Sequence, residues 1–218
     1  AGSPVEMGAW LSRAKALVWN WYAGMEGGKA LAEVLFGKVN PSGRLPESFP
    51  FSHMDCPAHC IGEFPGGKTV AYREGIFVGY RYYETRQMPV AFPFGYGLSY
   101  TEFTYERLKA RVKGNGNGAK VQVTLGVVNT GAMKGKEVVQ LYVGRKNSGE
   151  DRPIRELKAF DKISLKPGEI KNLEFMLDME AFSYYDEKEK EFRVEKGAYI
   201  ISVCRSAHEV WIETEVEL

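Results

Sequence analysis

The segment Lys120-Val-Gln-Val-Thr-Leu-Gly-Val-Val-Asn129 decides the fold class of this 218-residue chain. Its residues Val121, Val123, Leu125 and Val127 recur at every second position, which places them on one face of a β-strand. Further alternating segments follow, with turn signals about every ten residues. They are Thr104–Lys113, Glu137–Val143, Glu156–Leu165, Ile170–Leu177, Gly197–Cys204 and Glu209–Glu217. Short alternating strands at this spacing predict an antiparallel β-sandwich.

A charged segment, Asp186-Glu-Lys-Glu-Lys-Glu191, lies between these strands and alternates in the sign of its charge. We interpret it as a solvated hairpin. The whole β-rich region, residues 103–218, has roughly the length of an immunoglobulin-like or fibronectin type III-like domain.

The sequence pattern of the first 50 residues is typical of α/β structure. We expect a short helix over Glu6–Ala14, a buried strand over Ala16–Trp21, a helix over Lys29–Phe36 that ends at Gly37, and an edge strand over Arg44–Phe49. One strand and one helix cannot cover both faces of a parallel sheet. The segment therefore predicts the last part of a larger α/β domain whose other strands lie upstream.

Residues 51–102 lack a regular period and are rich in glycine, proline and aromatic rings. The rings belong to Tyr72, Phe77, Tyr80, Tyr82, Tyr83, Phe92, Phe94, Tyr96 and Tyr100. So long a segment without regular structure is unusual inside an isolated domain. We interpret it as a linker that wraps over neighbouring domains and packs its rings between them. An aromatic platform for sugars is the alternative.

The predicted fold class is therefore α+β. It consists of a terminal βα portion of an α/β sandwich over residues 1–50, a long aromatic linker over residues 51–102, and an antiparallel immunoglobulin/fibronectin type III-like β-sandwich over residues 103–218.

The composition excludes several classes of protein. Lys and Arg total 29 and Asp and Glu total 28, so the net charge of +1 argues against nucleic acid or a membrane surface as a partner. No apolar run approaches the roughly 20 residues of a membrane span. Because the chain begins at Ala1 rather than at Met, the possibility of an upstream leader or domain stays open.

Three cysteines, Cys56, Cys60 and Cys204, are too few for a disulfide framework, which favours free thiols and a cytoplasmic location. Cys56 and Cys60, together with His53 and His59, offer four possible zinc ligands. All four lie on one loop without a second ligand pair downstream, so we expect no metal. The Gly-rich turn before the second helix matches no phosphate-binding motif, and we expect no cofactor.

Several motifs together resemble glycoside hydrolase family 3. Those of the α/β domain and the linker are Trp21-Tyr-Ala-Gly-Met-Glu-Gly-Gly28, Asn40-Pro-Ser-Gly-Arg-Leu-Pro46, Tyr72-Arg-Glu-Gly-Ile-Phe-Val-Gly-Tyr-Arg-Tyr-Tyr83 and Phe92-Pro-Phe-Gly-Tyr-Gly-Leu-Ser-Tyr-Thr-Glu-Phe103. Those of the fibronectin type III-like domain are Glu137-Val-Val-Gln-Leu-Tyr142, Arg152-Pro-Ile-Arg-Glu-Leu-Lys158 and Lys166-Pro-Gly-Glu169. The resemblance covers essentially the whole chain; one departure is Ala23-Gly24-Met25, where the family commonly has Pro-Gly-Gln.

The resemblance implies a retaining, exo-acting β-glycosidase, and a β-glucosidase in particular. Such an enzyme needs a nucleophilic carboxylate and an acid/base carboxylate about 5–5.5 Å apart. In the family these lie on a (β/α)8 barrel and on an upstream loop of the α/β domain, so we expect no catalytic residue here. The expected partners are that barrel, the rest of the α/β domain and a β-glucoside.

Six residues remain as candidates for supporting roles. Tyr22 and Glu26 lie in the turn before the second helix, where a substrate-pocket rim would form. Glu26 could equally be a helix N-terminal charge. Arg73, Glu74, Arg81 and Tyr82 are predicted to make docking contacts between domains. An autonomous carbohydrate-binding module and a metal-organised interaction domain are the other hypotheses for the chain.

Overall fold

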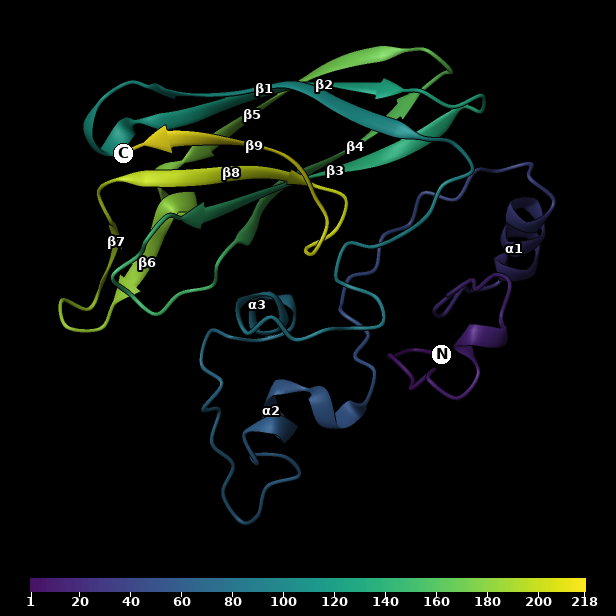
Figure 1. The fold of residues 1–218 in the computed structure, drawn as a ribbon, viewed down its shortest axis with the longest axis horizontal. Helices are drawn as coiled ribbons and strands as arrows, with labels where there is room; N and C mark the ends of the chain where they lie inside the picture. Colours follow the sequence, from purple (N-terminus) through teal and green to yellow (C-terminus); the bar gives the residue numbers. More distant parts are fainter.

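The computed structural model describes residues 1–218, apart from the side chain of Asn117. Figure 1 shows a β-sandwich, with the first 50 residues and the linker lying along one side of it. The C-terminus lies on the sandwich, and the N-terminus lies on the opposite side of the molecule. This arrangement confirms the predicted fold class.

Two antiparallel sheets form the sandwich. The three-stranded sheet has the order β1-β2-β5, with β1 over Phe103–Lys113, β2 over Lys120–Asn129 and β5 over Ile170–Asp178. The four-stranded sheet has the order β4-β3-β8-β9, with β4 over Glu156–Leu165, β3 over Gly135–Arg145, β8 over Ala198–Cys204 and β9 over Val210–Glu217. The expected hairpin is also present, as β6 (Ser183–Asp186) and β7 (Glu191–Val194).

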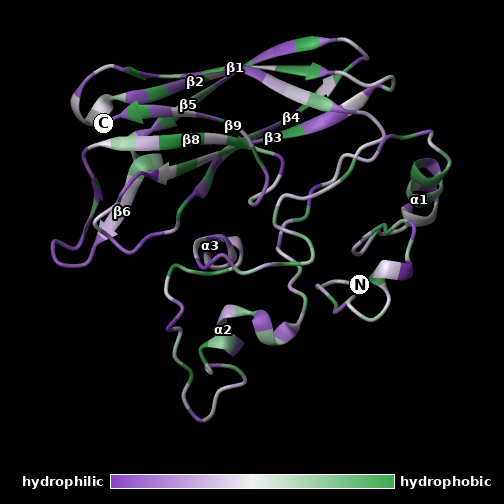
Figure 2. Ribbon diagram, in the orientation of Figure 1, coloured by the Kyte–Doolittle hydropathy of each residue, from purple (hydrophilic) through white to green (hydrophobic). Residues whose placement is uncertain are grey.

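The alternating residues of β2 and β3 form the core between the sheets. Val121, Val123, Val127, Val139 and Leu141 are fully buried. Figure 2 shows hydrophobic and hydrophilic residues alternating along these strands. Burying one Val or Leu side chain contributes roughly 1.5–3 kcal/mol, so this face accounts for much of the stability of the sandwich.

In the first 50 residues, the structure agrees with the prediction in one helix and differs from it in three other segments. Helix α1 spans Gly27–Leu35, and Gly37 follows it at φ +70°, where glycine avoids Cβ strain. Glu6–Ala14 forms only a 3-10 turn at Leu11–Arg13, because glycine at position 8 disfavours a continuous helix.

Ala16–Trp21 forms no strand in the described part of the chain, and Trp21 at its end has φ +41°. A buried parallel strand needs hydrogen-bonded neighbours on both sides, and residues 1–50 supply none. Instead Trp19 packs edge-on against the buried ring of Phe49, with 5.0 Å between ring centroids.

The linker contains three short helices where the sequence shows no regular period. These are η2 (His53–Asp55), α2 (Pro57–Cys60) and α3 (Tyr80–Thr85). The predicted edge strand Arg44–Phe49 makes one isolated antiparallel bridge, from Phe49 to Phe92. Pro46 removes a backbone donor there, so the pairing does not extend into a strand.

Candidate functional site

The linker and the first 50 residues are joined to the sandwich by a buried polar network centred on Glu137. This residue shares the inward face of β3 with Val139 and Leu141. Its Oε2 lies 2.8 Å from Arg44 Nη2, and its Oε1 accepts a hydrogen bond of 2.8 Å from the hydroxyl of Tyr105. Only 11% of the Arg44 side chain and 3% of the Glu137 side chain are exposed. A buried charge must be paired, so the sandwich requires the Arg44 loop at this point.

The hydroxyl of Tyr105 keeps its proton in this network. Burial, together with the neighbouring Glu137 carboxylate, raises the pKa of Tyr105 above its ordinary value. The phenol therefore donates to Glu137 rather than competing with it as a second anion.

A second buried contact joins the end of the linker to β3. Gln140 Nε2 donates to the carbonyls of Gly95 and Arg205, each at 3.0 Å, while Tyr142 donates to Gln140 Oε1 at 2.9 Å. Gly95 has φ +81°, and a Cβ on it would collide with Gln140 Oε1. Only glycine permits this approach.

Helix α3 docks onto the beginning of β4. The Leu157 N–H donates to the Tyr80 hydroxyl at 2.9 Å, and the Ile154 N–H donates to Thr85 Oγ1 at 3.1 Å. Arg81 Nε lies 3.1 Å from Glu156 Oε1. These contacts satisfy backbone donors next to the edge strand, so α3 covers what would otherwise be exposed pairing groups.

Glu84 of α3 faces the loop between β8 and β9. Its side chain is 8% exposed, and its Oε2 lies 3.3 Å from His208 Nδ1. Burial raises the pKa of Glu84, while the charges of His208 and Arg155 oppose the rise. We call the surface formed by these contacts the docking seam. It is defined by Arg44, Tyr80, Arg81, Glu84, Glu137 and Gln140.

The structure brings one of the four predicted docking residues into this seam. Arg81 contacts the sandwich, and Tyr82 lies beside it on α3, with its ring 5.9 Å from that of Tyr83. Arg73 pairs with Glu63 at 2.9 Å, which is a contact inside the linker. Glu74 Oε2 is buried and, among the described side chains, has no hydrogen-bond partner.

The two predicted rim residues lie apart from the docking seam. Tyr22 is 88% exposed, with its ring against the backbone of Gly2. Glu26 is exposed and immediately precedes α1, where its side chain makes no capping hydrogen bond. Its position is compatible with both interpretations given above, a rim residue and a helix N-terminal charge.

The possible zinc ligands do not converge. His53 Nδ1 lies 2.6 Å from Glu6 Oε1, and Cys60 Sγ donates to the Met54 carbonyl at 3.3 Å. Hydrogen bonds from the backbone and ring of His53 lower the pKa of Glu6 to about 2. No group of three potential ligands is close enough to hold a metal ion within the residues that the structure describes.

Sequence reasoning missed the centre of the docking seam, although one signal was available. Glu137 has the same strand parity as Val139 and Leu141, so the alternation already places this acid on the inward face. Arg44 and Tyr80 carry no comparable signal, because they lie outside regular strands and their partners are distant in sequence.

No helix among the described residues is long and apolar enough to cross a membrane.

Comparison with known proteins identifies both regions of the chain. The family model described as the glycosyl hydrolase family 3 C-terminal domain matches residues 1–100, and the model described as a fibronectin type III-like domain matches residues 137–207. Thermostable beta-glucosidase B of Acetivibrio thermocellus is 44% identical over all 218 residues, which correspond to 28% of that protein.

Solved structures agree with this assignment. The crystal structure of a beta-glucosidase from Kluyveromyces marxianus in complex with glucose has a TM-score of 0.92 and 43% identity, and the match covers 100% of this chain and 26% of that one. The GH3 beta-glucosidase of Bifidobacterium adolescentis has a TM-score of 0.91 and 40% identity, with 98% and 31% covered.

The chain thus spans between a quarter and a third of the length of these relatives. Its two regions match two domains of one family, and these relatives match along nearly the whole chain. The chain therefore belongs to glycoside hydrolase family 3, of which it carries the end of the C-terminal α/β domain and the fibronectin type III-like domain.

Proposed function

We propose that this chain is the C-terminal segment of a retaining, exo-acting β-glycosidase that releases terminal β-linked glucose. The observation that carries the proposal is the 44% identity, along the whole chain, to a protein named as a β-glucosidase. Glucose is also the bound molecule in the Kluyveromyces marxianus structure. Retaining hydrolysis uses two carboxylates, and we assign both to the rest of the enzyme.

The segment itself acts as a brace. We divide it into three parts. Residues 1–50 complete the α/β domain, residues 51–102 form the linker between that domain and the sandwich, and residues 103–218 form the sandwich. The docking seam supports this role, because it fixes the linker to the sandwich through buried polar contacts. Tyr22 and Glu26 serve at the pocket rim, and Arg73, Glu74, Arg81 and Tyr82 hold the linker in place.

Exposed apolar side chains in the first 50 residues favour a large covering partner. Met25 is 101% exposed and Phe36 is 81% exposed, on either side of α1. Large exposed apolar surface is typical of an interaction site. We assign the partners as the (β/α)8 barrel and the remaining α/β domain. The three free cysteines favour the cytoplasm as the compartment.

The experiment uses the intact polypeptide that contains this chain and an aryl β-glucoside. We expect hydrolysis whose first-formed sugar, observed by proton NMR, is β-glucose. An α-glucose product would contradict retention, and absence of hydrolysis of β-glucosides would contradict the assignment of the reaction.

A further inference from the structure

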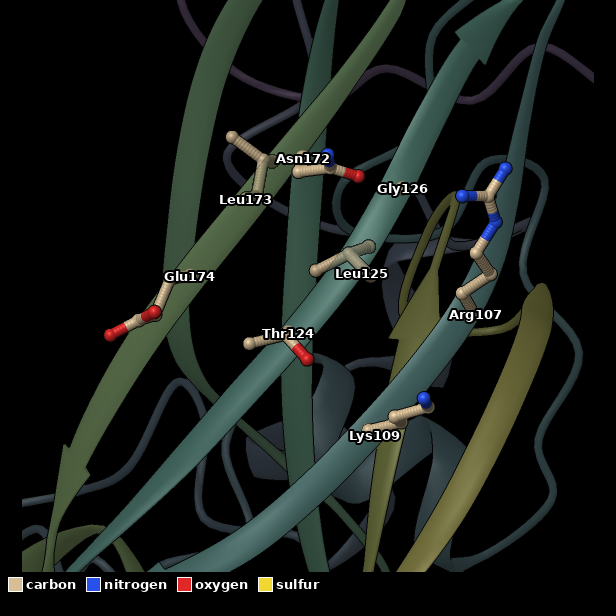
Figure 3. Close-up of a pocket in the computed structure, with 8 residues that line it drawn as sticks. All are labelled: Arg107, Lys109, Thr124, Leu125, Gly126, Asn172, Leu173 and Glu174. Atoms are coloured by element: carbon tan, nitrogen blue, oxygen red, sulfur yellow. The ribbon is translucent and has the colours of Figure 1, made fainter.

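A shallow groove of about 350 Å³ crosses the outer face of the three-stranded sheet. Polar groups from β1, β2 and β5 line most of it: Arg107, Lys109, Thr124, Gly126, Asn172 and Glu174. Figure 3 shows the two cationic side chains of β1 on one side, Asn172 and Glu174 of β5 on the other, and β2 between them. The groove lies on the sandwich and includes no residue of the docking seam.

Gly126 faces outward at the floor of the groove, where the side chain of Glu106 lies over it and buries it. Gly126 lies directly between Glu106 of β1 and Asn172 of β5 in the strand register. A Cβ at this position would lie 3.1 Å from Glu106 Cγ, so a larger residue would displace the Glu106 side chain. Glycine in the middle of a strand often marks the close approach of another group.

One wall of the groove depends on an irregularity in β1. The register shifts between Glu106 and Lys109, and Arg107 has φ +57°, which is unfavourable for a residue with a side chain. Such a bulge re-aims a side chain and is common beside functional sites. Here it adds Arg107 to the wall next to Lys109.

The polar groups of the two walls complement a sugar. Arg107 and Lys109 donate hydrogen bonds, Glu174 accepts them, and the Asn172 amide does both. Arg107 already pairs with Glu106, with 2.6 Å between Nη2 and Oε1. Among the described side chains, Lys109 and Glu174 have no ion-pair partner and remain available. The walls are two strand spacings apart, about 9.5 Å, which leaves room for one pyranose ring with hydrogen bonds on both edges.

We propose that this groove binds a β-linked glucan through the hydroxyl groups of successive sugars. The choice of a glucan as the ligand rests on the proposed function. The capacity of the groove to form hydrogen bonds is independent of that function. No aromatic ring lines the groove, so binding depends on hydrogen bonds without stacking.

The test is a titration of the isotope-labelled 218-residue chain with cellotetraose, followed by NMR. We expect saturable shifts of the Gly126 backbone amide and the Asn172 side-chain amide. The double variant Asn172→Ala/Glu174→Ala should raise the Kd at least about tenfold, because it removes one wall of acceptors. Both side chains are exposed, so the variant should keep the spectrum of a folded sandwich.

Gln122→Ala is the matched control, since Gln122 lies on β2 two residues from Thr124 and outside the groove. It should leave the Kd unchanged. Absence of saturable shifts at Gly126, or an equal Kd in the double variant and the wild type, would overturn the proposal. The titration measures binding alone, so its failure would leave the hydrolysis test of the intact polypeptide unaffected, and the reverse also holds.

Discussion

Arg44 and Glu137, which are 93 residues apart in the sequence, form a nearly buried ion pair with 2.8 Å between Nη2 and Oε2. Glu137 also accepts a hydrogen bond from the Tyr105 hydroxyl, and Arg44 Nη1 donates to the Gly97 carbonyl, whereas Arg44 Nε has no partner among the described groups. The pair ties the loop after α1 to the inner face of the sandwich. A pair of this kind costs desolvation when it forms, but losing one member leaves an uncompensated buried charge.

We therefore expect Arg44→Met to lower the free energy of unfolding by about 3–5 kcal/mol, measured by urea denaturation. The double variant Arg44→Met/Glu137→Leu should lose less than the sum of the two single losses, because no charge is left unpaired. Lys120→Met is the control, since its ion pair with Asp178 is exposed and has the same 2.8 Å distance. It should cost at most about 1 kcal/mol. Equal losses for Arg44→Met and Lys120→Met would contradict the role of the buried pair.

Alanine substitutions at two glycines with positive φ distinguish the cost of backbone strain from the cost of a steric collision. Gly95 has φ +81° and contacts Gln140, whereas Gly168 has φ +72° with open space around it. We expect Gly168→Ala to cost about 1–2 kcal/mol from the left-handed backbone alone. Gly95→Ala should cost clearly more in the same denaturation experiment, since its Cβ displaces Gln140 from three hydrogen bonds. Similar losses would show that the Gly95–Gln140 contact adds nothing.

Tyr80→Phe should loosen the contact between α3 and β4. The variant leaves the Leu157 N–H without its acceptor, which costs about 1 kcal/mol or more. Hydrogen exchange of the Leu157 amide should accelerate accordingly. Tyr185→Phe is the control, because Tyr185 is half exposed on the β6–β7 hairpin. Unchanged exchange at Leu157 in Tyr80→Phe would refute the docking of α3 through this hydroxyl.

Glu84 makes the stability of the docking seam depend on pH. Its folded-state pKa is raised above 4.5, mainly by burial. The stability contributed by the protonated acid is therefore fully present below pH 4.5 and is lost as the pH rises through the folded-state pKa. Glu84→Gln is neutral at every pH, so its stability relative to the wild type should increase between about pH 4 and about pH 7.

Denaturation at several pH values measures this difference. The same comparison in a His208→Gln background is the control, because His208 also faces Glu84 and opposes the rise of its pKa. There the pH-dependent difference should be larger. A difference that does not change with pH in either background would show that burial does not perturb Glu84.

The sandwich could be predicted from sequence because its signal is local. Val121, Val123, Leu125 and Val127 alternate within one strand, and β1, β5 and β9 repeat this pattern over most of their length. Helix α1 and its terminal Gly37 were predictable for the same reason. The strand expected at Ala16–Trp21 depends on neighbours that residues 1–50 do not supply, so its local apolar pattern was insufficient.

The docking seam was less accessible to sequence reasoning, since its contacts join residues far apart in the chain. The Tyr80 hydroxyl meets a backbone amide 77 residues away, and nothing in either local pattern indicates the pairing. Arg81 was predicted to dock, but its partner Glu156 was not. Arg73 was predicted to make a docking contact between domains, and among the described residues it pairs with Glu63 of the linker.

The most direct test of the account is an assay of the purified 218-residue chain, free of any companion polypeptide, with an aryl β-glucoside. We predict no turnover above the buffer background, because we assign both reacting carboxylates to the remainder of the enzyme. Hydrolysis by this chain alone at a rate typical of an enzyme would contradict it.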